Sequence, residues 1–348
     1  MARESLQAIL DRLEEKHVVI IGDLILDEYI WGDVKRISPE APVPVLETTS
    51  ETALFGGAAN VAHNVASLGG YANLIGVIGS DSNGKTLIGI LQEAGINTGG
   101  IHTDSSRPTS AKTRVIARAS STSVSNHQQL LRIDRESSLP VDASLQDELL
   151  KAVTDRISQA DALIIEDYEK GVLNPELIEN ILIVARQYNK PIVVDPKVEN
   201  FWHYKGVTSI TPNHKEAGAA LNREITDENS LIGVGEEILD RLALDGLLIT
   251  RGEQGMSLFR RIGDSPRMQV EHISPAQPRD VFDDTGAGDT VVAVFTLALA
   301  AGADMYDAAR LSNLAGGIVV GEVGCAAATH DSLSQAICLE AQREDRLS

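Results

Sequence analysis

Short apolar runs alternate along the chain with amphipathic stretches. Runs bounded by Gly, Asp or Pro predict buried strands, and stretches of helical period predict helices. The predicted strands are His17–Gly22, Asn73–Gly79, Ala162–Glu166, Pro191–Asp195 and Gly246–Thr250. The predicted helices are Ala58–Leu68, Ser144–Ser158, Pro175–Tyr188 and Ile232–Leu242. This alternation predicts an α/β fold with a mostly parallel central sheet covered on both faces.

Two stretches interrupt the alternation. Residues 28–48 contain three prolines and several β-branched residues, and residues 107–136 alternate polar and apolar side chains. Both predict β-structure outside the main sheet, forming a small lid over its active edge. The serine and threonine cluster at residues 120–125 is expected to be a loop tip. The sequence has no internal repeat, and we expect residues 1–348 to form one domain with these lid segments.

Charge and composition narrow the classes of partner. The chain has a formal net charge of −20, which argues against nucleic acid because such binding depends on basic contacts to phosphates. Cys325 and Cys338 lack the spacing of a zinc site or a disulfide framework. Residues 1–16 lack the apolar core of a signal peptide, and no apolar run is long enough to span a bilayer. We expect a cytoplasmic protein with no membrane partner.

Acidic residues stand directly after or at the ends of three predicted strands. They are Asp23, Asp167 and Asp195. The carboxyl ends of parallel strands meet at one edge of a sheet, where α/β proteins bind ligands. Each residue alone could cap a helix. Three together favour a site for the hydroxyl groups of a polyol.

The segment Asp283–Thr290 (DDTGAGDT) has the pattern of a phosphate site. Its small residues precede an apolar helical run, Val291–Ala301, so the backbone could approach an anion at the start of a helix. Asp289 could accept the proton of a hydroxyl that attacks the phosphate. The alternative is a glycine-rich turn with a helix cap.

A competing motif lies at Gly79–Thr86 (GSDSNGKT). It satisfies G-x-x-x-x-G-K-S/T after a predicted strand, as a Walker A loop does, and Leu163–Asp167 could form the matching Walker B strand. A P-loop NTPase is therefore an alternative. In the other interpretation this is a turn with a solvated Lys85. The P-loop interpretation leaves Asp283–Thr290 and the region around Gly56 unexplained.

Five segments, in order, resemble the ribokinase (PfkB-type) sugar kinase family. They are Gly22–Asp23, Gly56–Asn60, Gly79–Gly84, Asn213–Glu216 and Asp283–Thr290. The resemblance implies a ribokinase-like three-layer α/β/α fold with a small β-sheet lid. It also explains the Walker-like motif as the family's own G-x-D-x-x-G turn.

The resemblance implies an ATP-dependent kinase that uses Mg²⁺. Asp289 would be the general base, and the backbone of Gly286, Ala287 and Gly288 would form the anion hole. Asn213 and Glu216 would hold Mg²⁺, largely through water. The nucleotide side would further include His214, Lys215, Thr250, Arg251, Gly252 and Thr285.

Substrate contacts are implied in the same way. Asp23, Asn60 and Asp195, with the backbone of Gly56 and Gly57, would bind sugar hydroxyls. Candidates for a sugar phosphate are Arg36, Lys170 and Lys197, with Arg114 and Arg118 on the lid behind them.

A narrower resemblance points to the heptose 7-phosphate kinases. It is carried by Gly22–Tyr29, Arg36–Val45, Asp167–Gly171 and Asp195–Lys197. It implies transfer from ATP to O1 of D-glycero-β-D-manno-heptose 7-phosphate, giving the 1,7-bisphosphate on the path to ADP-heptose and lipopolysaccharide core. A kinase for another sugar, of the fructose or ribose type, is the alternative within the family.

Three further expectations complete this interpretation. No H-x-G-H nucleotidyl-transfer motif occurs in the chain, so we expect the kinase step alone. Asp284 departs from the family pattern, in which this residue is commonly uncharged. Open strand edges in the lid favour a homodimer that pairs through them.

Overall fold

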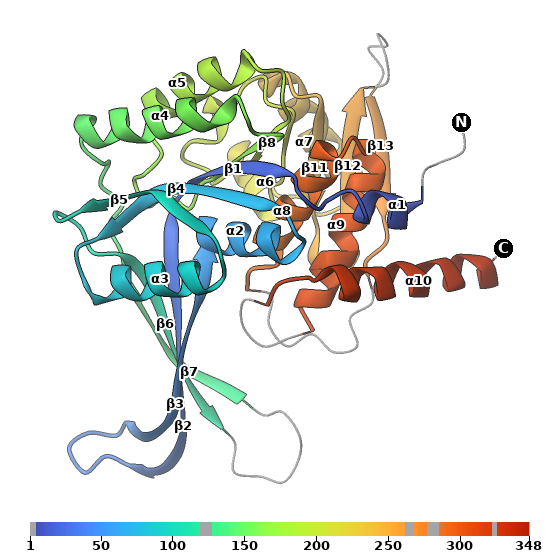
Figure 1. Ribbon diagram of the computed structural model, residues 1–348. Helices are drawn as coiled ribbons and strands as arrows, with labels where there is room; N and C mark the ends of the chain where they lie inside the picture. Colours follow the sequence, from blue (N-terminus) through green and yellow to red (C-terminus); the bar gives the residue numbers. More distant parts are fainter. Residues whose placement is uncertain (1–4, 119–126, 262–267, 277–284, 322–325, 348) are drawn as a thin grey trace.

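A computed structural model describes residues 5–118, 127–261, 268–276, 285–321 and 326–347, with side chains described for these residues except Arg118 and residues 343–347. A large sheet with helices on both faces forms the body, and a second sheet projects from it (Figure 1). The α/β prediction is confirmed. The cluster at residues 120–125 and the pair Asp283 and Asp284 lie outside the described residues.

The large sheet has nine strands. Their order is β13 (Met268–Ile273), β12 (Met256–Arg261), β11 (Gly246–Thr250), β10 (Ser209–Ile210), β9 (Ile192–Asp195), β8 (Ala162–Glu166), β1 (His17–Gly22), β4 (Tyr71–Gly79) and β5 (Asn97–Asp104). From β11 to β5 all neighbours are parallel, whereas β12 and β13 add an antiparallel edge. All the predicted strands lie in the parallel part of the sheet.

Helices cover the sheet in two layers (Figure 1). One layer packs on the core that contains Val18 and Ile20, and consists of α1 (Leu6–Leu10), α2 (Ala58–Ser67), α3 (Ser82–Glu93), α8 (Ala287–Ala300), α9 (Met305–Val319) and α10 (His330–Leu347). The other packs on the core that contains Val19 and Ile21, and consists of α4 (Ala143–Ile157), α5 (Pro175–Arg186), α6 (His214–Ala220) and α7 (Glu228–Leu242). Successive strand residues point to opposite faces, so one apolar run supplies both cores.

The small sheet is the lid. Its order is β3 (Pro44–Gly57), β2 (Leu24–Ile37), β6 (Ser110–Arg118) and β7 (His127–Arg135). Only Asp23 separates β2 from β1, and β3 leads directly into α2, so the lid starts at the carboxyl end of β1 (Figure 1). The predicted segments 28–48 and 107–136 both lie in this region, but the strands of the first begin earlier and end later.

Within the described residues, none of the helices combines the length and apolar character needed to cross a bilayer.

Candidate active site

Asp289 lies in the first turn of α8. Gly286 precedes the helix in the left-handed conformation (φ 80°), and Ala287 and Gly288 are its first residues. The N–H groups at the start of a helix have no partner within it, so they are available to an anion. The side chain of Asp289 is buried, at 2 % exposure. The sequence therefore places a carboxylate beside a set of backbone donors.

Two side chains from distant segments hold Asp289. Asn60 Nδ2 donates to one carboxylate oxygen at 2.8 Å, and the Tyr168 hydroxyl donates to the other at 2.7 Å. Asn64 donates to the backbone oxygen of Asn60 at 2.9 Å, and α2 packs against α8. The first turns of two helices therefore meet at Asp289.

Electrostatics favour proton acceptance at Asp289. Burial raises the pKa of this carboxyl, while the hydrogen bonds from Asn60 and Tyr168 act against the increase. A carboxylate with a raised pKa accepts a proton more readily than an ordinary exposed one.

Two further acids lie beside Asp289, at the ends of neighbouring strands. Glu166 on β8 is in register with Asp195 on β9. Burial raises the pKa of Asp195 to about 7, although Lys197 opposes it. Glu166 is fully buried, and neither of its carboxylate oxygens has a hydrogen-bond partner among the described residues. Burial, with Asp195 and Asp289 nearby, therefore raises the pKa of Glu166 well above its usual value.

Lys197 supplies positive charge to this cluster. Its ammonium pairs with Glu216 at the start of α6. Burial disfavours its charge, but Asp195 and Glu216 outweigh that effect and raise the pKa of Lys197. Lys197 therefore stays protonated beside the acids.

Asp23 holds the loop that carries Tyr168. Its carboxylate accepts hydrogen bonds from the backbone N–H groups of Tyr168 (2.8 Å), Lys170 (3.1 Å) and Val172 (3.3 Å). Burial, and then Asp167, raise its pKa to about 6. The predicted contact of Asp23 with sugar hydroxyls stays a prediction beside this positioning role.

Asp167 also has structural partners. It accepts hydrogen bonds from the Tyr204 hydroxyl at 2.6 Å, Asn200 Nδ2 at 3.0 Å and the Glu169 N–H at 2.9 Å. The acid at the end of this predicted strand thus stabilises the loop that follows it.

Gly56 and Gly57 form the joint between the lid and α2. Gly57 has φ 55°, and a Cβ there would lie 2.5 Å from the backbone oxygen of Asp23. At Gly56 a Cβ would lie 2.7 Å from Asp27 Oδ2. Both positions therefore exclude larger residues.

A cavity of about 410 Å³ opens beside the start of α8. Its lining is mainly small or apolar and includes Thr250, Gly252, Met256, Ala276, Gly288, Val291, Asn313, Gly316 and Gly317. Such a slot fits a flat aromatic base. Thr250 and Gly252 were predicted on the nucleotide side, and both contact this cavity.

A second hollow, of about 260 Å³, contains polar residues. His214 and Arg251 line it together with Asp227, Glu228 and Gln254. Arg251 donates to Gln254 Oε1 at 2.6 Å and to Ser257 Oγ at 3.2 Å. To contact the phosphates of ATP as predicted, the Arg251 guanidinium would therefore have to exchange its present partners, Gln254 and Ser257, for the phosphate.

Asn213 and Glu216 form a capping box at the start of α6. Asn213 Oδ1 accepts from the N–H groups of Lys215 (2.9 Å) and Glu216 (3.0 Å), and Glu216 Oε2 accepts from the Asn213 N–H (2.9 Å). The carboxylate of Glu216 keeps acceptor capacity for metal-bound water. Mg²⁺ is usually held by one or two carboxylates with water and phosphates, so this pair fits the ion.

The basic candidates fall into separate regions. Lys197 lies at the acid cluster, and Lys170 pairs with Glu136 at 2.9 Å. Arg114 forms a buried ion pair with Asp27 at 2.6 Å. The predicted candidate Arg36 is exposed near the far end of β2, so a substrate contact by Arg36 finds no support within one copy of the chain.

Sequence reasoning missed three residues of this region. The sequence gives Tyr168 no role within Asp167–Gly171, predicts Glu166 only as the end of a strand, and predicts no role for Lys112. A signal existed for Tyr168, because it follows two acids at a strand end. The sequence contains no such signal for Lys112 or Glu166, because the residues around them in the fold come from distant segments of the chain.

The Walker-like segment is a closed turn. Asp81 caps α3, accepting from the Gly84 N–H at 2.9 Å and the Thr109 hydroxyl at 2.7 Å. The Gly79 N–H is bonded to Thr109 Oγ1 at 2.8 Å. Lys85 is exposed on the helix. The backbone donors that a P-loop needs are thus used internally, and the P-loop alternative is wrong.

The fold and site define an ATP-dependent sugar kinase. The chain belongs to the pfkB family of carbohydrate kinases, which it matches over residues 15–332. It is 44% identical to bifunctional protein HldE of Geobacter metallireducens over 93% of this chain and 63% of that protein, and 43% identical to HldE of Geobacter sulfurreducens over the same shares. The chain thus spans under two thirds of these relatives.

Solved structures show the same fold. Phosphofructokinase-2 from Escherichia coli, in complex with substrates and products, superposes with a TM-score of 0.74 and 21% identity over 93% of this chain and 99% of that one. Arabidopsis thaliana ribokinase, complexed with ribose and ATP, gives 0.70 and 16% over the same shares. The ribokinase-like fold is confirmed.

Proposed function

We propose that this chain transfers the γ-phosphoryl group of ATP to O1 of D-glycero-β-D-manno-heptose 7-phosphate, giving the 1,7-bisphosphate and ADP. The observation that carries the proposal is the setting of Asp289 at the start of α8, between Asn60, Tyr168 and a nucleotide-sized cavity. Similarity to the HldE proteins supports the choice of a heptose phosphate. The product would serve ADP-heptose and lipopolysaccharide synthesis in the cytoplasm.

In this mechanism the sugar hydroxyl lies against the free lone pairs of Asp289. As O1 bonds to the γ-phosphorus, the bond from that phosphorus to the bridging oxygen of ADP breaks and the O1 proton passes to Asp289. The N–H groups of Gly286, Ala287 and Gly288 stabilise the negative charge of the group in transfer. Asn213 and Glu216 would hold Mg²⁺, which would supply positive charge to the phosphates.

The substrate is tested by measuring ADP release with heptose 7-phosphate, fructose 6-phosphate, fructose and ribose. We expect the highest kcat/KM with heptose 7-phosphate. A higher value with any of the other three overturns the choice of sugar but leaves the kinase class intact.

The base is tested with Asp289→Asn. We expect kcat to fall about 10²- to 10⁴-fold, the usual contribution of a general base, while the affinity for sugar stays within a few-fold. Lys85→Met is the control, since Lys85 is exposed on α3 outside the site, and it should retain full activity. Near-normal turnover by Asp289→Asn would refute the assignment.

We further propose a homodimer through the lid. Leu131 and Ile133 on the edge strand β7 are exposed at 54% and 46%, and an unpaired edge next to apolar side chains favours pairing with a second copy. Light scattering gives the mass in solution, and a monomer mass at micromolar concentration would contradict this.

A further inference from the structure

Lys112 lies on the face of the lid that looks toward the site. It is on β6, in register with Asp27 on β2 and Asp134 on β7. Its ammonium is 5.0 Å from the centroid of the Tyr168 ring. The hydroxyl of that ring bonds to Asp289, so one aromatic side chain spans the space between Lys112 and the base.

The other cations around this space each have a carboxylate partner. The pairs are Arg114 with Asp27, Arg132 with Asp134, Lys170 with Glu136 and Lys197 with Glu216. Among the residues that the structure describes, no ion pair or hydrogen bond joins Lys112 to a carboxylate. Its positive charge is therefore uncompensated by a direct contact.

This charge is also poorly solvated. Lys112 is half-buried, and burial is the main cause that lowers its pKa, although Asp27 acts against the decrease. A partly desolvated ammonium without a counter-ion is unfavourable, and an anion bound there would relieve the cost. The contact with the face of Tyr168 offsets only part of it.

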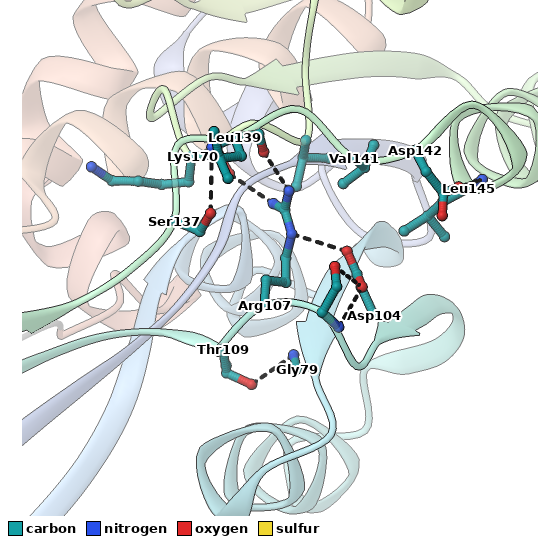
Figure 2. A network of polar contacts seen from close by, with 12 residues as sticks. Gly79, Asp104, Arg107, Thr109, Ser137, Leu139, Val141, Asp142, Leu145 and Lys170 are labelled. Atoms are coloured by element: carbon teal, nitrogen blue, oxygen red, sulfur yellow. Dashed lines mark hydrogen bonds and ion pairs between the residues drawn. The ribbon is translucent and has the colours of Figure 1, made fainter.

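The position of Lys112 relative to Tyr168 is firmly set. Arg107, just before β6, donates to the Lys170 backbone oxygen at 2.9 Å, to the Leu139 oxygen, and to Asp104 Oδ2 at 3.1 Å (Figure 2). This guanidinium ties the start of β6 to the loop that carries Tyr168. The strand that carries Lys112 and the loop that carries Tyr168 are therefore held next to each other.

We propose that Lys112 binds the phosphate that the sugar already carries, and so makes this enzyme prefer a sugar phosphate to a free sugar. The inference rests on the proposed function. With O1 at Asp289, the sugar would extend past Tyr168 toward the lid, and its distal phosphate would meet the one ammonium of this region that has no carboxylate partner among the described residues.

The test compares Lys112→Met with wild type, using heptose 7-phosphate and the corresponding unphosphorylated heptose. We expect KM for heptose 7-phosphate to rise about 10- to 100-fold, because a charge-assisted contact is lost, with kcat within about threefold. The kcat/KM for free heptose should not fall. Calorimetry without ATP should show the same loss of affinity for heptose 7-phosphate.

Lys35→Met is the matched control. It removes the same charge from an exposed lid lysine that pairs with Glu47, and it should leave the preference unchanged. Lys112→Arg should recover part of the affinity, which a purely structural role would not require. Thermal unfolding checks that each variant folds, and Lys112→Gln provides a second neutral side chain if the Met variant does not.

Two failures can be told apart. If wild type prefers sugar phosphates and Lys112→Met keeps that preference, the assignment of Lys112 is overturned and the proposed function stands. If wild type turns over free sugars better than sugar phosphates, both the proposed function and the role of Lys112 are overturned.

Discussion

At the scale of single residues, Tyr168 links Asp289, the proposed base, to the rest of the site. Its hydroxyl donates to Asp289, and two lysines lie over its ring, Lys112 and Lys197, each with its ammonium 5.0 Å from the centroid. The phenol therefore positions the carboxylate of Asp289 and stabilises its charged form, while its ring lies between the lid cation Lys112 and this carboxylate.

Tyr168→Phe is expected to move the acid limb of the kcat–pH profile upward. In wild type the hydrogen bond from Tyr168 lowers the pKa of Asp289. Its removal should raise that pKa by about one unit, the usual size for a contact to a charged group, so the carboxylate would be protonated up to a higher pH. Steady-state kinetics from pH 5 to 9 measure this shift.

Tyr204→Phe is the control, because it removes another buried hydroxyl whose partner is Asp167 rather than the base. An acid limb that is unchanged in Tyr168→Phe would mean that the hydroxyl does not influence Asp289.

At the scale of elements, the site depends on the joint between β3 and α2. Gly57 ends the lid strand and precedes the helix that presents Asn60 to Asp289. The N–H of Ala58 bonds to the Asp23 oxygen at 3.0 Å, so the same joint holds the end of β1. The lid and Asp289 are thus coupled through a few backbone atoms.

Gly57→Ala should destabilise the protein and slow the kinase reaction. The positive φ and the contact at 2.5 Å force the backbone to shift, for a loss of about 1–3 kcal/mol in the free energy of unfolding. Asn60 would move with the helix, so kcat should fall as well. Urea unfolding and ADP-release assays measure the two effects.

Gly89→Ala provides the contrast. Gly89 lies within α3 and an added Cβ would meet nothing within 4 Å, so alanine should stabilise by about 0.5–1 kcal/mol. If the two variants changed the free energy of unfolding by the same amount, a side chain at position 57 would not strain the joint.

At the scale of the whole molecule, buried acids set the response to pH. Burial is the first cause that raises the pKa of Asp23 to about 6, that of Asp195 to about 7 and that of Glu166 well above its usual value. The folded protein thus keeps protons that the unfolded chain releases near pH 4. The resulting stability is present at low pH and is lost as pH rises through the folded pKa values.

Glu166→Gln should make stability less dependent on pH. Each proton that only the folded state retains lowers the free energy of unfolding by up to about 1.4 kcal/mol for each unit that the pH rises. The amide of Gln does not titrate, so the contribution of this one group is removed. Urea unfolding at pH 5.5 and pH 8 should therefore show a smaller decrease than in wild type.

Glu236→Gln is the control, because it neutralises a carboxylate that is exposed to solvent on α7. This variant should lose as much stability between pH 5.5 and pH 8 as wild type does. A Glu166→Gln variant that loses as much stability as wild type between these pH values would mean that Glu166 does not retain its proton in the folded protein.

The sequence by itself determined the features that depend on neighbours along the chain. Hydrophobic period placed the strands of the parallel sheet, and the small residues before the helix that became α8 predicted a phosphate turn with Asp289. These features follow from local backbone preferences and from the burial of alternate faces, which a short stretch of residues expresses completely.

The tertiary structure alone decided which distant side chains meet. Asn60, Tyr168 and Asp289 come together because β8 lies next to β1 and because α2 packs on α8. Lys112 faces Tyr168 through the register of the lid, and Thr109 closes the turn that resembles a P-loop. Strand order and register arise from packing between segments far apart in the chain, so no local pattern contains them.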